Sequence, residues 1–119
     1  MKDLKISKEL LSEVLNYEVD VFLGINKNEI DYTCCRDENE GYVDISINLY
    51  EFAFKCKEWA FKNKYKIQSQ INESNKGHSH ITKKNDDCWA KGFFEDTEIE
   101  VIIKACEFIL TKRNQNENK

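Results

Sequence analysis

The sequence contains no proline and only four glycines among its 119 residues. No apolar run approaches the ~18 residues that cross a membrane, and the opening MKDLK lacks the apolar core of a secretion signal. It also has no glycine-rich phosphate loop, no His-Glu-x-x-His and no Cys-x-x-Cys. These absences disfavour a transmembrane protein, a secreted precursor and an enzyme that depends on one of those motifs.

The cysteines are odd in number and follow no secretion signal; they are Cys34, Cys35, Cys56, Cys88 and Cys106. This pattern is typical of reduced thiols in a cytoplasmic protein rather than of a disulfide framework. Cys56 and Cys106 fall in apolar helix stripes, where a thiol behaves as a small hydrophobic group. Cys35 is expected to point outward, but no base adjoins it. We therefore expect inert thiols and no enzymatic activity.

The length and composition of the chain fit one domain. With 40% hydrophobic and 12% aromatic residues, 119 residues suffice to bury a single core. The C-terminal residues are polar. We expect one domain over residues 1–113, followed by a frayed tail over residues 114–119.

The first half of the chain predicts a helix and then strands. Residues 7–16 (SKELLSEVLN) have helical apolar spacing, with Ser7 as the N-cap. Residues 17–25 and 30–34 alternate as a hairpin does, and residues 42–47 either add a third strand or lead into the next helix. The side chains expected on the buried face of the first strand are Tyr17, Val19, Val21, Leu23 and Ile25.

The second half begins and ends with a capped helix. Asn48 with Glu51, and Thr97 with Glu100, have capping-box spacing. The first of these helices is expected to run to about Lys64. Between the two helices, short strands are expected at residues 65–71, 78–84 and 88–94. The order α-β-β-(β)-α-β-β-β-α predicts an α+β fold, an antiparallel sheet packed by about three helices.

Two histidines raise the question of a metal site. On a strand, His78 and His80 face the same side, and Cys88 follows across the next turn. Three such ligands with an open fourth position would suit a catalytic zinc ion. The simpler interpretation is a pair of solvent-facing histidines on a hairpin, and we predict no metal, cofactor or catalytic residue.

Charge is distributed unevenly along the chain. Residues 1–50 hold five basic and eleven acidic side chains, whereas residues 51–94 hold nine lysines and five acids. Basic groups beside aromatic side chains are what single-stranded nucleic acids contact. An acidic loop can instead dock onto a basic partner. The candidate partner-binding residues are Asp37, Glu38, Glu40, Asp44, Trp59, Lys62, Lys66, Lys83 and Lys84.

Residues 48–113 share the order α-β-β-β-α with the double-stranded-RNA-binding domain. That family begins its second helix with a lysine cluster that binds phosphates. Here the corresponding segment is DTEIE at residues 96–100, whose carboxylates would repel a nucleic-acid backbone. We therefore do not expect an RNA-binding domain of that kind.

A second resemblance covers residues 45–111. The segment INLYEFAFKCKEWA (residues 47–60), followed by strands and by FEDTEIEVIIKACEFIL (residues 94–110), resembles small phage and prophage proteins. Those proteins pair a helix near "KCKEWA" with a closing helix near "TEPEAIFKACEWIL", and Ile99 stands here where proline is expected. The shared positions are mostly caps and core residues, so the resemblance implies a fold and assigns no active site.

These observations favour a phage-like interaction protein of the host cytoplasm, with no membrane contact. The resemblance and the split charge suggest an inhibitor of a host defence nuclease, of the anti-CRISPR type, which binds a host protein or ribonucleoprotein complex or its guide RNA. The alternative is an accessory protein that binds single-stranded nucleic acid through the basic block at residues 51–94.

Overall fold

The computed structural model describes residues 4–37, 41–71, 76–83, 89–95 and 97–117. In chain order the helices and strands are α1 (Lys8–Leu15), β1 (Val21–Asn26), β2 (Glu29–Asp37), β3 (Gly41–Asn48), α2 (Leu49–Lys62), β4 (Tyr65–Ile71), β5 (Gly77–Lys83), β6 (Trp89–Glu95) and α3 (Glu98–Glu117). The α+β class and the element order are confirmed, including the third strand β3.

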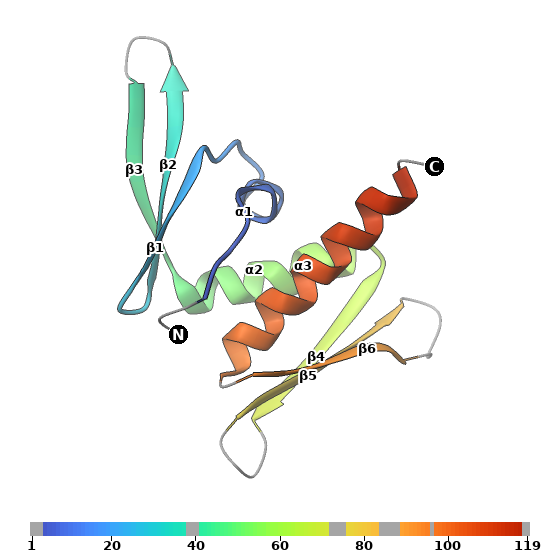
Figure 1. The fold of residues 1–119 in the computed structure, drawn as a ribbon. Helices are drawn as coiled ribbons and strands as arrows, with labels where there is room; N and C mark the ends of the chain where they lie inside the picture. Colours follow the sequence, from blue (N-terminus) through green and yellow to red (C-terminus); the bar gives the residue numbers. More distant parts are fainter. Residues whose placement is uncertain (1–3, 38–40, 72–75, 84–88, 96, 118–119) are drawn as a thin grey trace.

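The six described strands divide between two antiparallel sheets, where the sequence predicted one. Sheet A has the order β1-β2-β3 and sheet B the order β4-β5-β6. Helices α2 and α3 lie against sheet B, and α1 lies between sheet A and α3 (Figure 1). Alternating strand patterns are alike in the two sheets, so the sequence carries no local signal that separates them.

The predicted buried face of the first strand is wrong for Tyr17, Val21 and Leu23, which are exposed, whereas Val19 is buried as predicted. The strand begins at Val21, and its pairing with β2 shifts between Phe22 and Gly24, so that Leu23 is an extra, bulged residue. The shift turns Val21 and Leu23 to solvent, while Phe22 and Ile25 pack against the core. A bulge changes which side chains face inward, and the sequence alternation alone does not reveal it.

The helix caps form largely as the sequence predicts. The hydroxyl of Ser7 accepts a hydrogen bond from the backbone N–H of Leu10 at 3.1 Å. The Asn48 side chain accepts from the backbone N–H groups of Tyr50 and Glu51, at 2.9 and 3.1 Å. Helix α2 ends at Lys62, two residues before its predicted end. These caps fix where α1 leaves the N-terminal segment and where β3 passes directly into α2.

One hydrophobic cluster links both sheets to all three helices. It includes Leu10 of α1, Tyr32 of β2, Phe52 of α2 and Ile81 of β5, each almost fully buried. The apolar stripe predicted for the closing helix is buried throughout; its members are Ile99, Ile102, Ile103, Cys106, Ile109 and Leu110. Helix α3 continues to Glu117, so the segment predicted as a frayed tail from residue 114 is largely helical.

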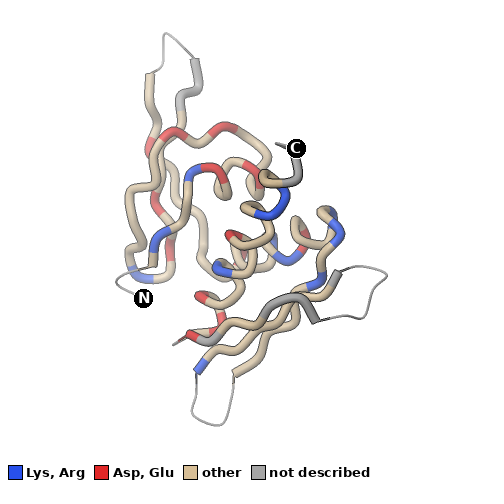
Figure 2. Tube along the Cα trace, turned by 45° about the vertical axis from the view of Figure 1, so that its right-hand side comes forward, with Lys and Arg blue, Asp and Glu red and all other residues tan. Residues whose placement is uncertain are grey.

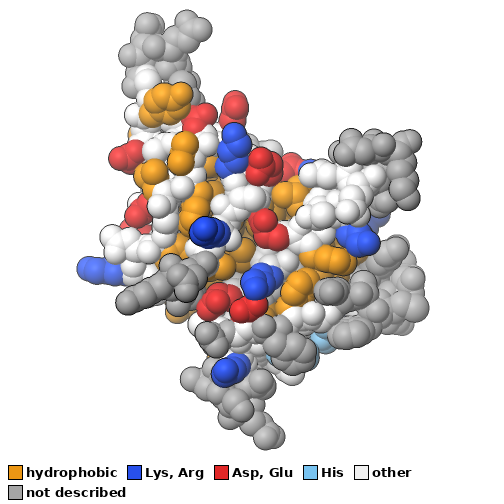
Figure 3. All heavy atoms as spheres, in the orientation of Figure 1, with side chains coloured by type: hydrophobic (Ala, Val, Ile, Leu, Met, Phe, Trp, Pro, Cys, Tyr) orange, Lys and Arg blue, Asp and Glu red, His pale blue; other side chains and the backbone are white. Residues whose placement is uncertain are grey.

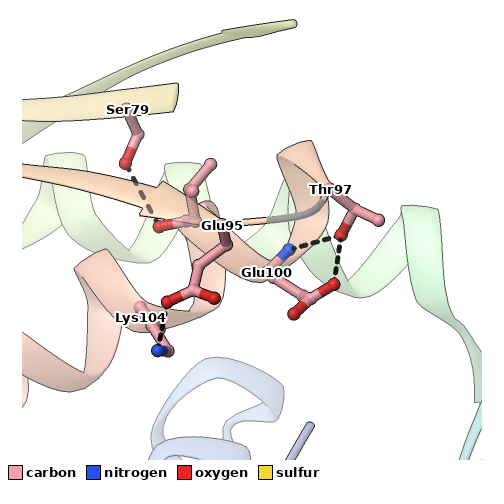
Figure 4. Close-up of polar contacts among 6 residues, drawn as sticks. Ser79, Glu95, Thr97, Glu100 and Lys104 are labelled. Atoms are coloured by element: carbon pink, nitrogen blue, oxygen red, sulfur yellow. Dashed lines mark hydrogen bonds and ion pairs between the residues drawn. The ribbon is translucent and has the colours of Figure 1, made fainter. Parts of the chain in front are cut away.

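The start of α3 is held closely against sheet B. The Thr97 hydroxyl accepts from the backbone N–H of Glu100 at 3.2 Å and donates to its carboxylate at 3.0 Å (Figure 4). The buried hydroxyl of Ser79 donates to the carbonyl oxygen of Val101 at 3.2 Å. Gly77 lies so close that a Cβ atom there would stand 2.1 Å from the Thr97 carbonyl oxygen.

Among the helices described, none is both long and apolar enough to cross a membrane.

Candidate functional site

The predicted acidic loop, formed by Asp37, Glu38, Glu40 and Asp44, lies only partly within the described residues. Glu38, Glu40 and Lys84 lie outside the described residues, as do the side chains of Asp37 and Lys83 at the ends of their strands. Asp44 is described, and it is exposed on β3. Its position opposite Thr33 places it on the outer face of sheet A, away from the core.

The outer face of sheet A combines apolar side chains with carboxylates. Val21, Leu23 and Tyr42 are 51%, 54% and 71% exposed. Asp31 and Asp44 share this face through the register of β2 with β3. The strand side chains described in this sheet include no lysine or arginine. Exposed apolar groups with acidic neighbours are suited to contact a basic protein surface.

A shallow hollow of about 330 Å³ opens on this side of sheet A. Its lining residues are Leu23, Gly24, Ile25, Asn26, Asp31, Asp44, Ile45 and Ser46. The Ser46 hydroxyl donates to a carboxylate oxygen of Asp31 at 2.6 Å, which fixes that carboxylate at the rim. In Figure 3, hydrophobic side chains and carboxylates lie side by side over the sheet A region on the left of the view. The hollow therefore combines apolar side chains (Leu23, Ile25 and Ile45) with the carboxylates of Asp31 and Asp44.

Tyrosine packing supports the opposite face of sheet A. The Tyr32 ring is buried, and its hydroxyl is hydrogen-bonded to the hydroxyl of Tyr17. Burial, and then this hydrogen bond, raise the pKa of Tyr32 well above its usual value. Cys34 lies on the same buried face. The packed inner face supports the outer face, and a surface that is ordered before binding loses less entropy when a partner docks on it.

The lysine candidates lie at the other end of the molecule. Lys62 ends α2 and Lys66 begins β4, and both are exposed. In Figure 2 the end of α2 and the start of β4 are blue, whereas red predominates over α1 and sheet A. Trp59, predicted as a partner contact, is instead only 7% exposed, and the Arg113 guanidinium lies 6.0 Å from its ring centre. Trp59 is therefore a core residue and is withdrawn from the candidate surface.

The histidine pair faces one side of sheet B, as the strand spacing predicts. The two ring centres lie 6.1 Å apart. The amide nitrogen of Gln70 lies 3.3 Å from Nδ1 of His78, and Nε2 of His80 is hydrogen-bonded to the Gln68 side chain. These four side chains, together with Lys57 and the neighbouring Ile67 and Ser69, line a cleft of about 380 Å³. No carboxylate is among the lining residues, so the cleft is a hydrogen-bonding, weakly basic surface.

Of the three zinc ligands considered from the sequence, only His78 and His80 lie in the part of the chain that the structure describes. There, no group of three histidine, cysteine or carboxylate side chains is arranged to hold a metal ion. Cys88, the third ligand considered from the sequence, lies outside the described residues. On this side of sheet B, the structure therefore shows two histidines whose ring nitrogens contact glutamine side chains.

Two further thiols are enclosed between helices. Cys56 of α2 and Cys106 of α3 are fully buried, and the Cys106 thiol donates to the carbonyl oxygen of Cys56 at 3.5 Å. Burial raises the pKa of the Cys56 thiol well above its ordinary value. A nucleophilic cysteine needs the opposite shift, so this pair serves as packing.

A stripe of exposed aromatic residues on α2 was missed by the sequence reasoning. Tyr50, Phe54 and Phe61 are 59%, 66% and 50% exposed. Their spacing of four and seven residues places them on one face of the helix. The signal was present in the sequence. It was obscured because the opposite face of α2 is also apolar and satisfies the core pattern by itself.

Comparisons of the chain with protein-family models, with curated proteins and with solved structures found no match. The surfaces described above are therefore the main guide to the function of this chain.

Proposed function

We propose that this chain is a non-enzymatic interaction protein that docks through the outer face of sheet A onto a basic partner. The observation that carries the proposal is the combination of exposed Val21, Leu23 and Tyr42 with Asp31 and Asp44 on one sheet face. The proposed partner is a host defence nuclease of the CRISPR type, and the proposed place where the protein binds it is the host cytoplasm. The protein acts as an inhibitor that blocks access to the nuclease.

The arrangement has the composition of a protein interface. Apolar and aromatic side chains at the centre of an interface supply most of the binding free energy once they are desolvated. Carboxylates at the edge contribute less affinity, but they steer a basic partner and reject an acidic one. Among the large hydrophobic side chains described on the face, Tyr42 is the most exposed, so we expect it to be the principal anchor.

A nuclease fits this chemistry because its nucleic-acid channel must be positively charged. An acidic, apolar platform that binds beside such a channel competes with the phosphate backbone. The resemblance of residues 45–111 to small phage proteins supports the same direction, since phages gain from inhibiting host defence. The net charge of −4 is small, which favours a local block over mimicry of a whole DNA duplex.

The test is co-purification of the tagged full chain with candidate CRISPR effector complexes, followed by target-cleavage assays. Leu23→Lys and Asp44→Lys should each weaken inhibition at least tenfold, because one buries a charge in the interface and the other reverses a steering charge. Glu9→Lys on α1 makes the same change of charge as Asp44→Lys, but not on the outer face of sheet A, and should leave inhibition unchanged. Unaltered cleavage with the wild-type chain across effector types refutes the proposal.

A second candidate is an accessory protein that binds single-stranded nucleic acid through residues 51–94. It is favoured by the cleft on sheet B, where Lys57 lies beside His78 and His80 with no carboxylate in the lining. Exposed Lys62 and Lys66 extend the positive charge. Gel shifts at increasing salt separate the two candidates, because phosphate contacts weaken steeply with ionic strength.

A further inference from the structure

The exposed face of α2 has an aromatic stripe, within whose arc Lys57 also falls, and an ordered charged edge. Tyr50, Phe54 and Phe61 lie within about 40° of one another around the helix axis, since each residue turns by roughly 100°. Together they leave roughly 300 Å² of aromatic surface in water, about half of what three such side chains can bury. A patch of roughly this size lies at the lower end of the range for the largest apolar patch on a monomer, and such patches are often functional.

The edge beside this stripe alternates in charge. Glu51, Lys55, Glu58 and Lys62 follow one another at intervals of three or four residues along one side of it. The order is therefore negative, positive, negative, positive. Turned end for end, it becomes positive, negative, positive, negative. A sequence of charges that is its own complement when reversed is matched by an antiparallel copy of itself.

We propose that α2 pairs with α2 of a second copy of this chain, antiparallel and related by a two-fold axis. In this arrangement Glu51 faces Lys62 of the second copy, and Lys55 faces Glu58 of the second copy. By symmetry each ion pair occurs twice. The aromatic side chains of the two stripes interleave between them, as side chains do wherever two helices pack.

Other occupants fit this face less well. A nucleic acid would bring its phosphates next to Glu51 and Glu58, which repel them. A uniformly basic or acidic protein would meet like charges at every second position of the edge. Along this edge the second copy satisfies both signs, and it requires no partner from outside; Lys57, within the arc of the stripe, lines the cleft on sheet B.

The size of the stripe predicts a weak, reversible dimer. Interfaces of standard size bury about 800 Å² from each partner, whereas this one draws on roughly 300 Å² of aromatic surface together with its charged edge. We therefore expect half-dissociation at a concentration on the order of 100 µM. The ion pairs at the rim contribute little affinity and mainly fix the direction and register of the helices.

Sedimentation velocity of the full chain from about 5 µM to about 500 µM tests the proposal. The mean mass should rise from 14.1 kDa toward twice that value. Phe54→Ala should weaken association at least tenfold. Tyr42→Ala, which removes a similarly exposed aromatic side chain from sheet A, should leave it unchanged.

A charge swap provides the decisive control. Glu58→Lys should weaken the dimer at least fivefold, because it then faces Lys55 of the second copy. The double variant Lys55→Glu/Glu58→Lys should restore association to within twofold of wild type. Within one helix the double variant places like charges four residues apart, which disfavours the helix, so recovery reports the contact between copies.

Three outcomes overturn the proposal: a constant monomer mass over the whole range, weakening by Tyr42→Ala instead of Phe54→Ala, or failure of the double variant to recover. Circular dichroism of each variant shows whether it is folded. Because Glu58 and Lys55 are on the surface, the charge variants keep the test valid if Phe54→Ala misfolds. The assay contains neither nuclease nor nucleic acid, so its failure is separate from failure of the proposed function.

Discussion

Among Gly24, Gly41 and Gly77, an added methyl group should disturb the fold most at Gly77. It lies at the start of β5, directly under the first residues of α3. A Cβ atom at this position would stand 2.1 Å from the carbonyl oxygen and 2.3 Å from the carbonyl carbon of Thr97, and 2.6 Å from the backbone nitrogen of Glu98. All three are backbone atoms, so no side-chain rotation can relieve the contact. Gly77→Ala must therefore move the start of α3 away from sheet B.

The expected loss of stability follows from what that movement breaks. Overpacking of a closely fitted site costs about 1–3 kcal/mol. The displacement also strains the Ser79 hydrogen bond to Val101 and the 2.7 Å bond from the Ser69 hydroxyl to Glu98, each with a net value of about 0.5–1.5 kcal/mol. We expect a loss of roughly 3–4 kcal/mol in the free energy of unfolding, which lowers Tm by roughly 10–20 °C for a chain of this length.

Urea unfolding followed by far-UV circular dichroism measures this loss. Gly41→Ala is the matched control: Gly41 has φ +68°, but a Cβ atom there would have nothing within 4 Å, so only backbone strain opposes the change. That strain costs about 1–2 kcal/mol. If Gly77→Ala lies within about 0.5 kcal/mol of wild type, or costs no more than Gly41→Ala, the close approach of α3 to β5 is wrong.

Three further predictions concern the cap, the thiols and the tyrosine. Asn48→Ala removes the acceptor for two backbone N–H groups of α2 and should lower the free energy of unfolding by about 1 kcal/mol in urea melts; no change would mean that the cap is not formed. Cys34, Cys56 and Cys106 are buried, so native protein should leave at least these three of its five thiols unreacted with a thiol reagent, whereas unfolded protein should expose them all. The raised pKa of Tyr32 means that the folded state keeps this proton while the unfolded state loses it near pH 10. Stability should therefore fall as the pH rises above about 10, and Tyr32→Phe should reduce the slope of that fall in denaturant melts.

Elements whose signals are local could be predicted from the sequence. The N-caps at Ser7 and Asn48 depend on residues within three positions, and the structure forms both. The α3 stripe depends on a period of 3.6 residues, and every predicted member of it is buried. Neither inference needed to know where the rest of the chain lies.

Features set by distant contacts could not be predicted in this way. The outward turn of Leu23 follows from a bulge in the pairing of β1 with β2, and only the paired strand defines that bulge. The division into two sheets depends on which strands meet, whereas the side-chain alternation is the same for either arrangement. Trp59 looked like a surface anchor because it is large and lies beside lysines, but its angle on α2 places it in the arc of Phe52 and Cys56, which faces the core.

The two exposed aromatic surfaces differ in their charges, and this difference separates their roles. Tyr42 on sheet A has Asp31 and Asp44 on its face, and the described strand side chains of that sheet add no cation to balance them. A second copy of the same face would meet like charges, so this surface is suited to a basic partner and poorly suited to itself. Phe54 on α2 lies beside an edge of alternating sign, which an identical helix complements and a partner of one sign does not. Removing Tyr42 should therefore impair partner binding alone, and removing Phe54 should impair self-association alone.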